Sequence, residues 1–182
     1  VLFRSGYRCD LVPLADGGEG TLEALGGPNR TTTVTGPLGD PVDAPWRLDR
    51  GRAVIEMARA SGLAVVGGAE GNDPVSATTA GTGELIATAI ESGAKRIVVG
   101  VGGSATTDGG LGAVRALSPR QRLRGVELLV ACDVRTRFVA AAEVFAPQKG
   151  ATPKQVELLR RRLERLVGVY RDDFGVDVGD LD

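Results

Sequence analysis

The sequence of 182 residues contains no histidine, and aromatic residues make up only 4% of it. Without histidine the chain cannot build a Ser-His-Asp triad, a Cys-His pair or a histidine general base, and most catalytic zinc sites are excluded as well. Acid–base chemistry must therefore fall to carboxylates, lysine, tyrosine or cysteine. The two cysteines, Cys9 and Cys132, form neither a Cys-x-x-Cys motif nor a disulfide framework, so we expect a reducing compartment, the cytoplasm.

Charge and hydropathy exclude two further kinds of partner. The chain has 22 basic and 23 acidic residues, a formal net charge of −1, which leaves little to hold a nucleic-acid backbone. With so few aromatic rings it also has little on which to stack bases. No apolar run approaches the roughly 18–20 residues of a membrane span, and no secretory signal is evident. We therefore expect neither nucleic acid nor a membrane as a partner, and the sequence leaves the oligomeric state open.

Glycine, by contrast, is abundant, with 27 residues, and the pattern around it is that of an α/β protein. The length corresponds to about one domain at roughly 150 residues per domain, or to one and a piece of another. Strands are predicted at 10–15, 30–35, 42–48, 53–57, 95–101 and 126–131, and the last two are continuous apolar runs typical of strands buried on both faces. Helices are predicted at 21–25, 81–92, 111–117 and from 153 onward. The βαβ spacing from 95 to 131 favours a mixed, partly parallel sheet with flanking helices.

The last helix is the clearest element, and it carries four arginines, at positions 160, 161, 162 and 165. Thr152 and Gln155 form a capping box in front of it, with Pro153 at the first helical position. The arginines could be taken for a nucleic-acid patch. Because Glu157 and Glu164 interleave with them, we interpret this surface as a solvated helix face.

The first loop with candidate chemistry holds two carboxylates three residues apart, Asp16 and Glu19, between glycines. The glycines expose backbone N–H groups, and both carboxylates can reach one point, which suits a metal ion or a substrate hydroxyl. A structural alternative explains the same residues, namely an Asx-type turn with Glu19 as a favourable charge near the start of the next helix.

The second loop, residues 100–110, is the strongest candidate because it has five glycines among eleven residues. It follows a predicted buried strand and precedes a helix, so its backbone N–H groups form a candidate anion site. Asp108 adds a carboxylate that can hold Mg²⁺ or accept a proton. The structural alternative is a glycine-bearing turn with Asp108 as the helix N-cap. The candidate phosphate-binding groups here are Gly102, Gly103, Ser104 and Thr106.

The same loop also matches a loose dinucleotide-binding fingerprint, Gly100-x-Gly102-x-x-Ala105. The acidic ribose partner expected about 20 residues further on is missing, since the next candidate is Asp133. The loop is not a Walker A motif either, because no Gly-Lys-Ser/Thr follows. A nucleotide- or dinucleotide-binding oxidoreductase therefore remains an alternative function.

Two single residues, Lys149 and Asp133, complete the set of candidate site residues. Lys149 has a long stem and a point charge suited to a phosphate or carboxylate oxygen, although a surface lysine is equally typical. Asp133 directly follows a predicted strand, where α/β sheets tend to hold functional groups, and it could also cap a turn. Positioned N–H groups, a carboxylate for a metal, a cation and a base fit phosphoryl transfer, and none of these roles requires histidine.

Seven motifs stand in series along the chain, at 12–21, 34–39, 55–63, 81–86, 100–112, 130–134 and 144–151. In this order they resemble the glycerate kinases of the bacterial glycerate 2-kinase type. The resemblance implies transfer of the γ-phosphate of ATP to D-glycerate with Mg²⁺, and a fold of two α/β domains, one Rossmann-like and one inserted within it. By motif position it places Asp16, Glu19, Ser104, Thr106, Asp108, Asp133 and Lys149 in the site. From their chemistry we assign Asp108 or Asp16 to metal or base work and Lys149 to charge neutralisation. The predicted catalytic residues are thus Asp16, Asp108 and Lys149, with Asp108 also the predicted metal ligand, and Glu19 and Asp133 join the phosphate-binding groups of loop 100–110.

The chain also departs from this family. Members are about twice as long and carry an opening Asp-Ser-Phe-Lys-like motif and a glycine-rich second half, and here both are absent. The connection between 117 and 126 is shorter too. We therefore expect residues 1–27 to be a remnant of the Rossmann-like domain and residues 28–182 to be an incomplete inserted domain. We expect little or no activity from the chain alone, and a non-catalytic anion-binding remnant is a further alternative.

Overall fold

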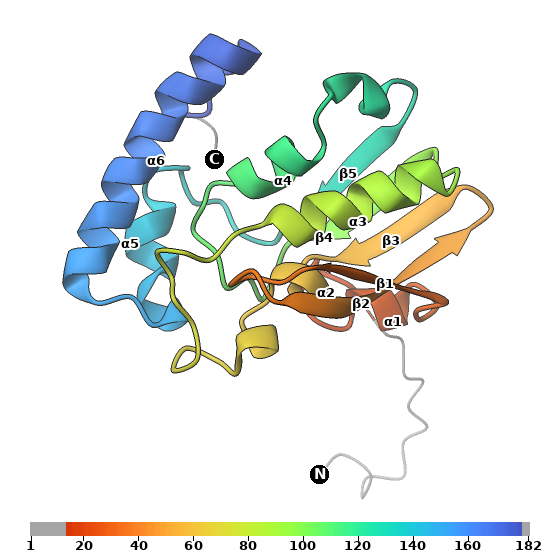
Figure 1. The fold of residues 1–182 in the computed structure, drawn as a ribbon, viewed down its shortest axis with the longest axis horizontal. Coiled ribbons are helices and arrows are strands. Elements are labelled where there is room, and N and C mark those ends of the chain that lie inside the picture. The colour runs from red at the N-terminus through yellow and green to blue at the C-terminus, as the bar shows by residue number, and fades with distance from the viewer. Residues whose placement is uncertain (1–13, 180–182) are drawn as a thin grey trace, which may run out of the picture.

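The computed structural model describes residues 14–179, and its centre is a five-stranded sheet in the order β1-β2-β3-β4-β5 (Figure 1). The first three strands pair antiparallel, and the last three pair parallel. The predicted mixed α/β sheet is thus confirmed. The strands are β1 (Arg30–Thr35), β2 (Pro41–Asp49), β3 (Arg52–Glu56), β4 (Arg96–Gly100) and β5 (Glu127–Ala131).

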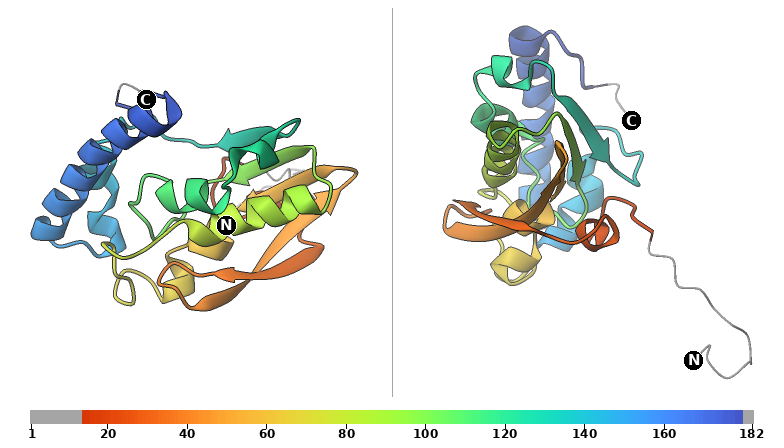
Figure 2. Two further views of the ribbon diagram at one scale, coloured as in Figure 1. Left: turned by 45° about the horizontal axis from the view of Figure 1, so that its top comes forward. Right: turned by 90° about the vertical axis from the view of Figure 1, so that its right-hand side faces the viewer.

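Helices cover the sheet and extend beyond one end of it (Figure 2). α3 and α4 lie side by side, each within a connection between parallel strands, and α6 stands apart with α5. No helix in the described range is both long enough and apolar enough to cross a lipid bilayer. The α-helices are α1 (Thr21–Ala24), α2 (Ala58–Ser61), α3 (Ala80–Glu91), α4 (Leu111–Ala116), α5 (Ala141–Phe145) and α6 (Pro153–Phe174), and the 3₁₀ turns are η2 (Ala64–Val66), η3 (Arg120–Leu123) and η4 (Pro147–Lys149).

The larger core lies between the sheet and α3. In β2 the alternating pattern buries Ala44 and Trp46, as predicted. Trp46 is 1% exposed, and its indole Nε1 donates to Thr32 Oγ1 at 2.9 Å, so the ring is buried without an unpaired donor. Leu85 of α3 and Ile97 of β4 are fully buried in the same cluster. Each such side chain stabilises the fold by about 1.5–3 kcal/mol relative to an exposed one.

A second core holds α6 against α5 and the start of α4. The predicted capping box is present: Thr152 Oγ1 accepts the backbone N–H of Gln155, and Gln155 Oε1 accepts the N–H of Thr152. The buried stripe of the helix continues to Tyr170, whose hydroxyl donates to the carbonyl of Gly109 at 2.9 Å. α6 therefore fastens the end of the glycine-rich loop 100–110.

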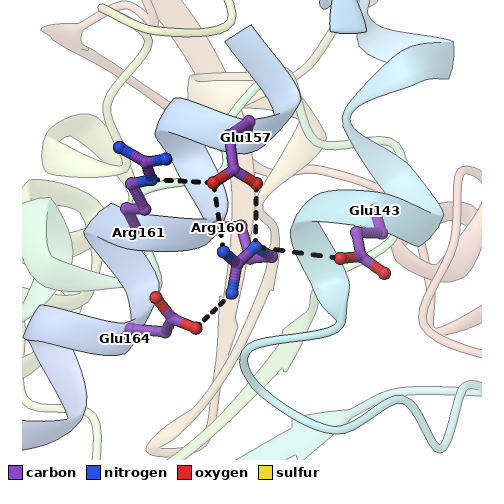
Figure 3. Close-up of polar contacts among 5 residues, drawn as sticks. All are labelled: Glu143, Glu157, Arg160, Arg161 and Glu164. Atoms are coloured by element: carbon purple, nitrogen blue, oxygen red, sulfur yellow. Dashed lines mark hydrogen bonds and ion pairs between the residues drawn. The ribbon is translucent and has the colours of Figure 1, made fainter. Parts of the chain in front are cut away.

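The outer face of α6 is a network of ion pairs (Figure 3). Arg160 contacts Glu157 and Glu164 on its own helix and Glu143 on α5, and Arg161 contacts Glu157 at 2.7 Å. Hydrogen bonds from the two guanidinium groups lower the pKa of Glu157 to about 2. The glutamates thus offset the arginine charge along this face, as the interleaved sequence predicts.

Two predicted strands, 10–15 and 126–131, differ from the structure or lie partly outside the residues that it describes. The strand predicted at 10–15 lies mostly outside the described residues, and Leu14 at its end is 90% exposed and in no strand. The prediction that the strand at 126–131 is buried on both faces is wrong for the described chain. β5 forms the edge of the sheet, and Leu128, Leu129 and Val130 are 37%, 42% and 61% exposed. An apolar run specifies a strand but does not supply the elements that would cover it.

Glycines allow two loops, 16–20 and 100–110, to meet at the carboxyl ends of the parallel strands β4 and β5. Gly17 adopts a φ of +95°, and a Cβ there would lie 2.2 Å from the carbonyl oxygen of Ala131 at the end of β5. A Cβ on Gly102 would lie 2.6 Å from the Cα of Gly18, and the N–H of Gly102 donates to the carbonyl of Gly17 at 2.9 Å. Loop 16–20 is therefore held directly against the ends of β4 and β5. The assignment of residues 1–27 to a separate domain stays a prediction.

We expect Gly102→Ala to destabilise the fold by about 1–3 kcal/mol, because the added methyl group forces the two loops apart. Gly168→Ala is the matched control: Gly168 lies within α6, a Cβ there meets nothing within 4 Å, and alanine favours the helix by up to about 1 kcal/mol. Urea unfolding of both variants measures the difference. Equal stability of Gly102→Ala and the wild type would show that the loops do not need this contact.

Candidate active site

The three predicted loops and the end of β5 enclose one cleft of about 740 Å³. Loop 16–20, loop 101–104, the residues after β5 and the turn η4 each contribute a wall. The structure thus gathers groups that lie more than 100 residues apart in the sequence. Six of the predicted site residues line it: Glu19, Gly102, Gly103, Ser104, Asp133 and Lys149.

Lys149 is the buried cation of this cleft. Its side chain is 8% exposed, and its Nζ donates to Ser104 Oγ at 2.7 Å and to the carbonyl oxygen of Thr106. Burial lowers the pKa of Lys149 to about 8, and the nearby negative charge of Asp108 partly opposes this shift. The ammonium group therefore stays mostly protonated at pH 7 and is held in one position beside the Ser104 hydroxyl.

The backbone of loop 101–104 supplies donors for an anion. Within residues 14–179, the N–H groups of Gly103 and Ser104 donate to no protein acceptor, and both residues line the cleft. Gly102 was expected to contribute in the same way, but its N–H is already bonded to Gly17. Thr106 was expected to offer its hydroxyl, but its side chain is buried and its carbonyl, instead, receives the lysine. Two N–H groups, one hydroxyl and one ammonium remain as candidate anion-binding groups.

Carboxylates lie on the exposed side of the cleft. Glu19 stands beside Gly103, since a Cβ on that glycine would be 3.4 Å from Glu19 Oε1, and Asp133 follows β5. Within the described part of the chain, no three acidic, histidine or cysteine side chains cluster tightly enough to hold a metal by themselves. One or two carboxylates together with substrate phosphates are, however, the usual ligands of Mg²⁺. Glu19 and Asp133 fit that ligand set.

Asp16 is not brought into the cleft. Its side chain is exposed, and its Oδ1 accepts the N–H of Gly18 at 2.9 Å, which is the Asx-type turn of the structural alternative. This turn fixes the backbone of loop 16–20 ahead of Glu19.

Asp108, predicted as the metal ligand and a catalytic group, instead joins two helices. Its Oδ2 accepts the N–H and the hydroxyl of Thr79 at 2.8 Å each and the N–H of Gly112 at 3.2 Å, while Oδ1 accepts the N–H of Gly110. Thr79 is the N-cap of α3, and Gly110 is the N-cap of α4. With its oxygens engaged and outside the cleft lining, the carboxylate fits a structural role and does not fit a metal ligand.

Sequence reasoning missed several residues of this region. Leu63, Ala64 and Gly68 form an apolar wall of the cleft and carry no chemical motif. Asn72 lies behind the cleft and contacts both the loop 101–106 and the turn of Lys149. The sequence around Asn72 carries no local signal for this position, since both its partners are distant along the chain.

The lowered pKa of Lys149 predicts a specific pH dependence of stability. Below about pH 8 the lysine is protonated in both the folded and the unfolded state, so its effect is constant. Between pH 8 and about 10.5 the unfolded state binds more protons, so the wild type gains stability relative to Lys149→Met, by up to ~1.4 kcal/mol per pH unit. Urea unfolding between pH 7 and 10 measures this difference. The control is Lys154→Met, because Lys154 is exposed and its loss should not change this pH dependence. If the difference in free energy of unfolding between the wild type and Lys149→Met stays constant from pH 7 to 10, the ammonium is not buried.

The contacts of Asp108 predict that Asp108→Asn lowers the free energy of unfolding by about 1–3 kcal/mol, because the amide replaces an accepting oxygen with a donor facing other donors. The matched control is Asp172→Asn, on the exposed face of α6, with an expected change within about 0.5 kcal/mol. Thermal or urea unfolding provides the measurement. Unchanged stability together with a sharp loss of activity would restore Asp108 to the chemistry.

Comparison with known proteins agrees with this geometry. A model of the glycerate kinase family matches residues 3–121 and 118–182. The chain is 41% identical to the glycerate 2-kinase of Escherichia coli, with 93% of this chain and 54% of that protein covered, and 39% identical to the glycerate kinase of Bacillus subtilis, with 90% and 52% covered. A crystal structure of a Salmonella typhimurium protein designated glycerate kinase 2 superposes with a TM-score of 0.86 at 39% identity and covers 93% of this chain and 56% of that one.

The chain spans about half the length of the curated relatives it matches. The family model matches in two parts that overlap at 118–121, within the connection 117–126 that we expect to be shorter here than in the family. Two matched parts reach from residue 3 to residue 182, so the likeness is not confined to one motif. The chain therefore belongs to the glycerate kinase family.

Proposed function

We propose that the protein formed by this chain transfers the γ-phosphate of ATP to a hydroxyl group of D-glycerate. The observation that carries the proposal is the convergence of groups in one cleft of a glycerate kinase family member. A buried ammonium, a hydroxyl, two carboxylates and two N–H groups that donate to no acceptor among residues 14–179 all line it. This is the set of groups that phosphoryl transfer needs, because the reaction is catalysed mainly by positioning and by charge stabilisation.

Lys149, Ser104 and the N–H of Gly103 would bind the phosphoryl oxygens. The ammonium neutralises negative charge that spreads over these oxygens during transfer, and the N–H groups point at positions fixed by the loop. Because Lys149 is already bonded to Ser104, its position requires no rearrangement when the anion arrives. Preformed donors of this kind stabilise a transition state more than flexible surface donors do.

The two carboxylates would divide the remaining work. Glu19, beside the N–H of Gly103, would hold Mg²⁺ together with the nucleotide phosphates, and the ion supplies charge neutralisation to the phosphates. Asp133 stands at the carboxyl end of β5 and would accept the proton of the glycerate hydroxyl. Asp16 and Asp108, by their contacts, would hold the loops and take no part in proton transfer.

The test is ADP release with ATP, Mg²⁺ and D-glycerate, measured for the 182-residue chain and for the longest natural protein that contains it. Lys149→Met should lower kcat at least 100-fold and leave the far-ultraviolet circular dichroism unchanged, because the cation is lost but the fold is not. Lys154→Met, the matched control on the first turn of α6, should keep the wild-type rate.

Two outcomes would overturn the proposed kinase function, and a third would change only the role of Lys149. Saturable quenching or enhancement of nicotinamide fluorescence without phosphoryl transfer would favour the oxidoreductase alternative, in which loop 100–110 binds a dinucleotide. Binding of inorganic phosphate with no turnover in any form of the protein would favour the non-catalytic anion-binding alternative. D-Glycerate phosphorylation that survives Lys149→Met would remove the lysine from the mechanism.

A further inference from the structure

Asn72 joins the two segments that carry the cation and its hydroxyl partner. Its Nδ2 donates to the carbonyl oxygen of Ala105 at 3.0 Å and to the carbonyl oxygen of Lys149 at 2.9 Å. These two acceptors lie 33 and 77 residues away in the sequence. One amide group therefore ties loop 101–106 to the turn η4.

The orientation of the Asn72 amide follows from its neighbours. Both facing atoms are carbonyl oxygens, so only the NH₂ group can satisfy them, and the reversed amide would place oxygen against oxygen. The other end of the amide, Oδ1, is buried and accepts no hydrogen bond from any residue in the range 14–179. The contacts that fix Asn72 are therefore its two donor bonds, and both go to backbone of segments that line or flank the cleft.

The turn of Lys149 and the loop that carries Asn72 touch at a second point. Gly150, which follows Lys149, has a φ of +94°, and a Cβ there would lie 2.4 Å from the carbonyl oxygen of Ala69. The turn is therefore packed against the loop that carries Asn72. Lys149 Nζ meanwhile reaches the carbonyl of Thr106, the residue after Ala105. The contacts close a ring that runs from Asn72 to Ala105, Thr106, the Lys149 ammonium, the Lys149 carbonyl and back to Asn72.

We propose that Asn72 is a positioning residue of the cleft, which fixes the backbone of Lys149 relative to loop 104–106 so that the lysine ammonium has a single place beside Ser104. The ring itself is a property of the fold, and its importance for phosphoryl transfer rests on the proposed function. Removing the Asn72 amide opens the ring at two bonds. The lysine side chain then becomes more mobile and its ammonium group better hydrated. The pKa of Lys149 therefore rises from about 8 toward its ordinary value.

Competitive amine labelling measures this directly. Limiting acetic anhydride is applied between pH 6 and 11, and mass spectrometry reports the labelling of each lysine separately. The chain has three lysines, so exposed Lys95 and Lys154 serve as internal references. In Asn72→Ala we expect the labelling midpoint of Lys149 to rise by at least one pH unit, with the midpoints of the references unchanged.

The matched control is Asn29→Ala. Asn29 also makes two hydrogen bonds to backbone, donating to the carbonyl of Leu48 at 2.9 Å and accepting its N–H at 2.9 Å, but it lies away from the cleft. Its loss should lower stability and leave the Lys149 midpoint at the wild-type value. A second variant, Asn72→Leu, keeps the shape of the side chain, removes both donors and should raise the midpoint as Asn72→Ala does.

An unchanged Lys149 midpoint in folded Asn72→Ala or Asn72→Leu would overturn the proposal. Unfolding of both variants would also overturn it, because Asn72 would then be a residue of the fold in general. The fate of the proposed function is read separately, from ADP release by the wild type. A shifted midpoint with no glycerate phosphorylation would retain the positioning role and reject the kinase function. An unshifted Lys149 midpoint together with glycerate phosphorylation by the wild type would reject the positioning role of Asn72 and retain the kinase function.

Discussion

The site depends on one steric constraint, the direct approach of backbone to backbone at the carboxyl ends of β4 and β5. Gly17 lies so close to the carbonyl of Ala131 that no side chain fits, and Gly102 lies almost as close to Gly18. This contact places Glu19 beside Gly103 in loop 101–104, where the N–H groups of Gly103 and Ser104 donate to no acceptor among residues 14–179. Larger residues at these positions would separate loop 16–20 from loop 101–104, and the cleft would lose Glu19, one of its three charged side chains.

The second constraint is electrostatic. A buried ammonium loses hydration, and its neighbours must replace the lost water as hydrogen-bond acceptors. Ser104 Oγ and the carbonyl of Thr106 do so for Lys149, and Asn72 holds the segments that carry them. Polar groups of this kind are poor contributors to stability, so their arrangement behind a cleft is a sign of a functional site rather than of an optimised core.

Local patterns predicted much of the fold but less of the site. β1 was predictable from its run of β-branched residues, and the capping box of α6 was predictable because a cap acts on its immediate neighbours. The exposure of β5 was not, because an apolar strand reads the same whether or not other elements cover it. The role of Asp108 was not predictable because an aspartate before two glycines suits both a metal ligand and a cap, and its bonds to Thr79 favour the cap. Asn72 gave no local signal because both its partners are distant in sequence.

The absence of histidine acquires a physical meaning from Lys149. A phosphate-binding cation must remain charged near neutral pH, and burial lowers the pKa of a lysine toward that range. With a pKa of about 8, Lys149 is buried enough to be fixed and still mostly charged at pH 7. Burial of similar degree would leave a histidine, with its ordinary pKa of about 6.5, neutral at the same pH. The site therefore combines a buried lysine with exposed carboxylates, and in such a cleft a histidine would supply no charge that the anion needs.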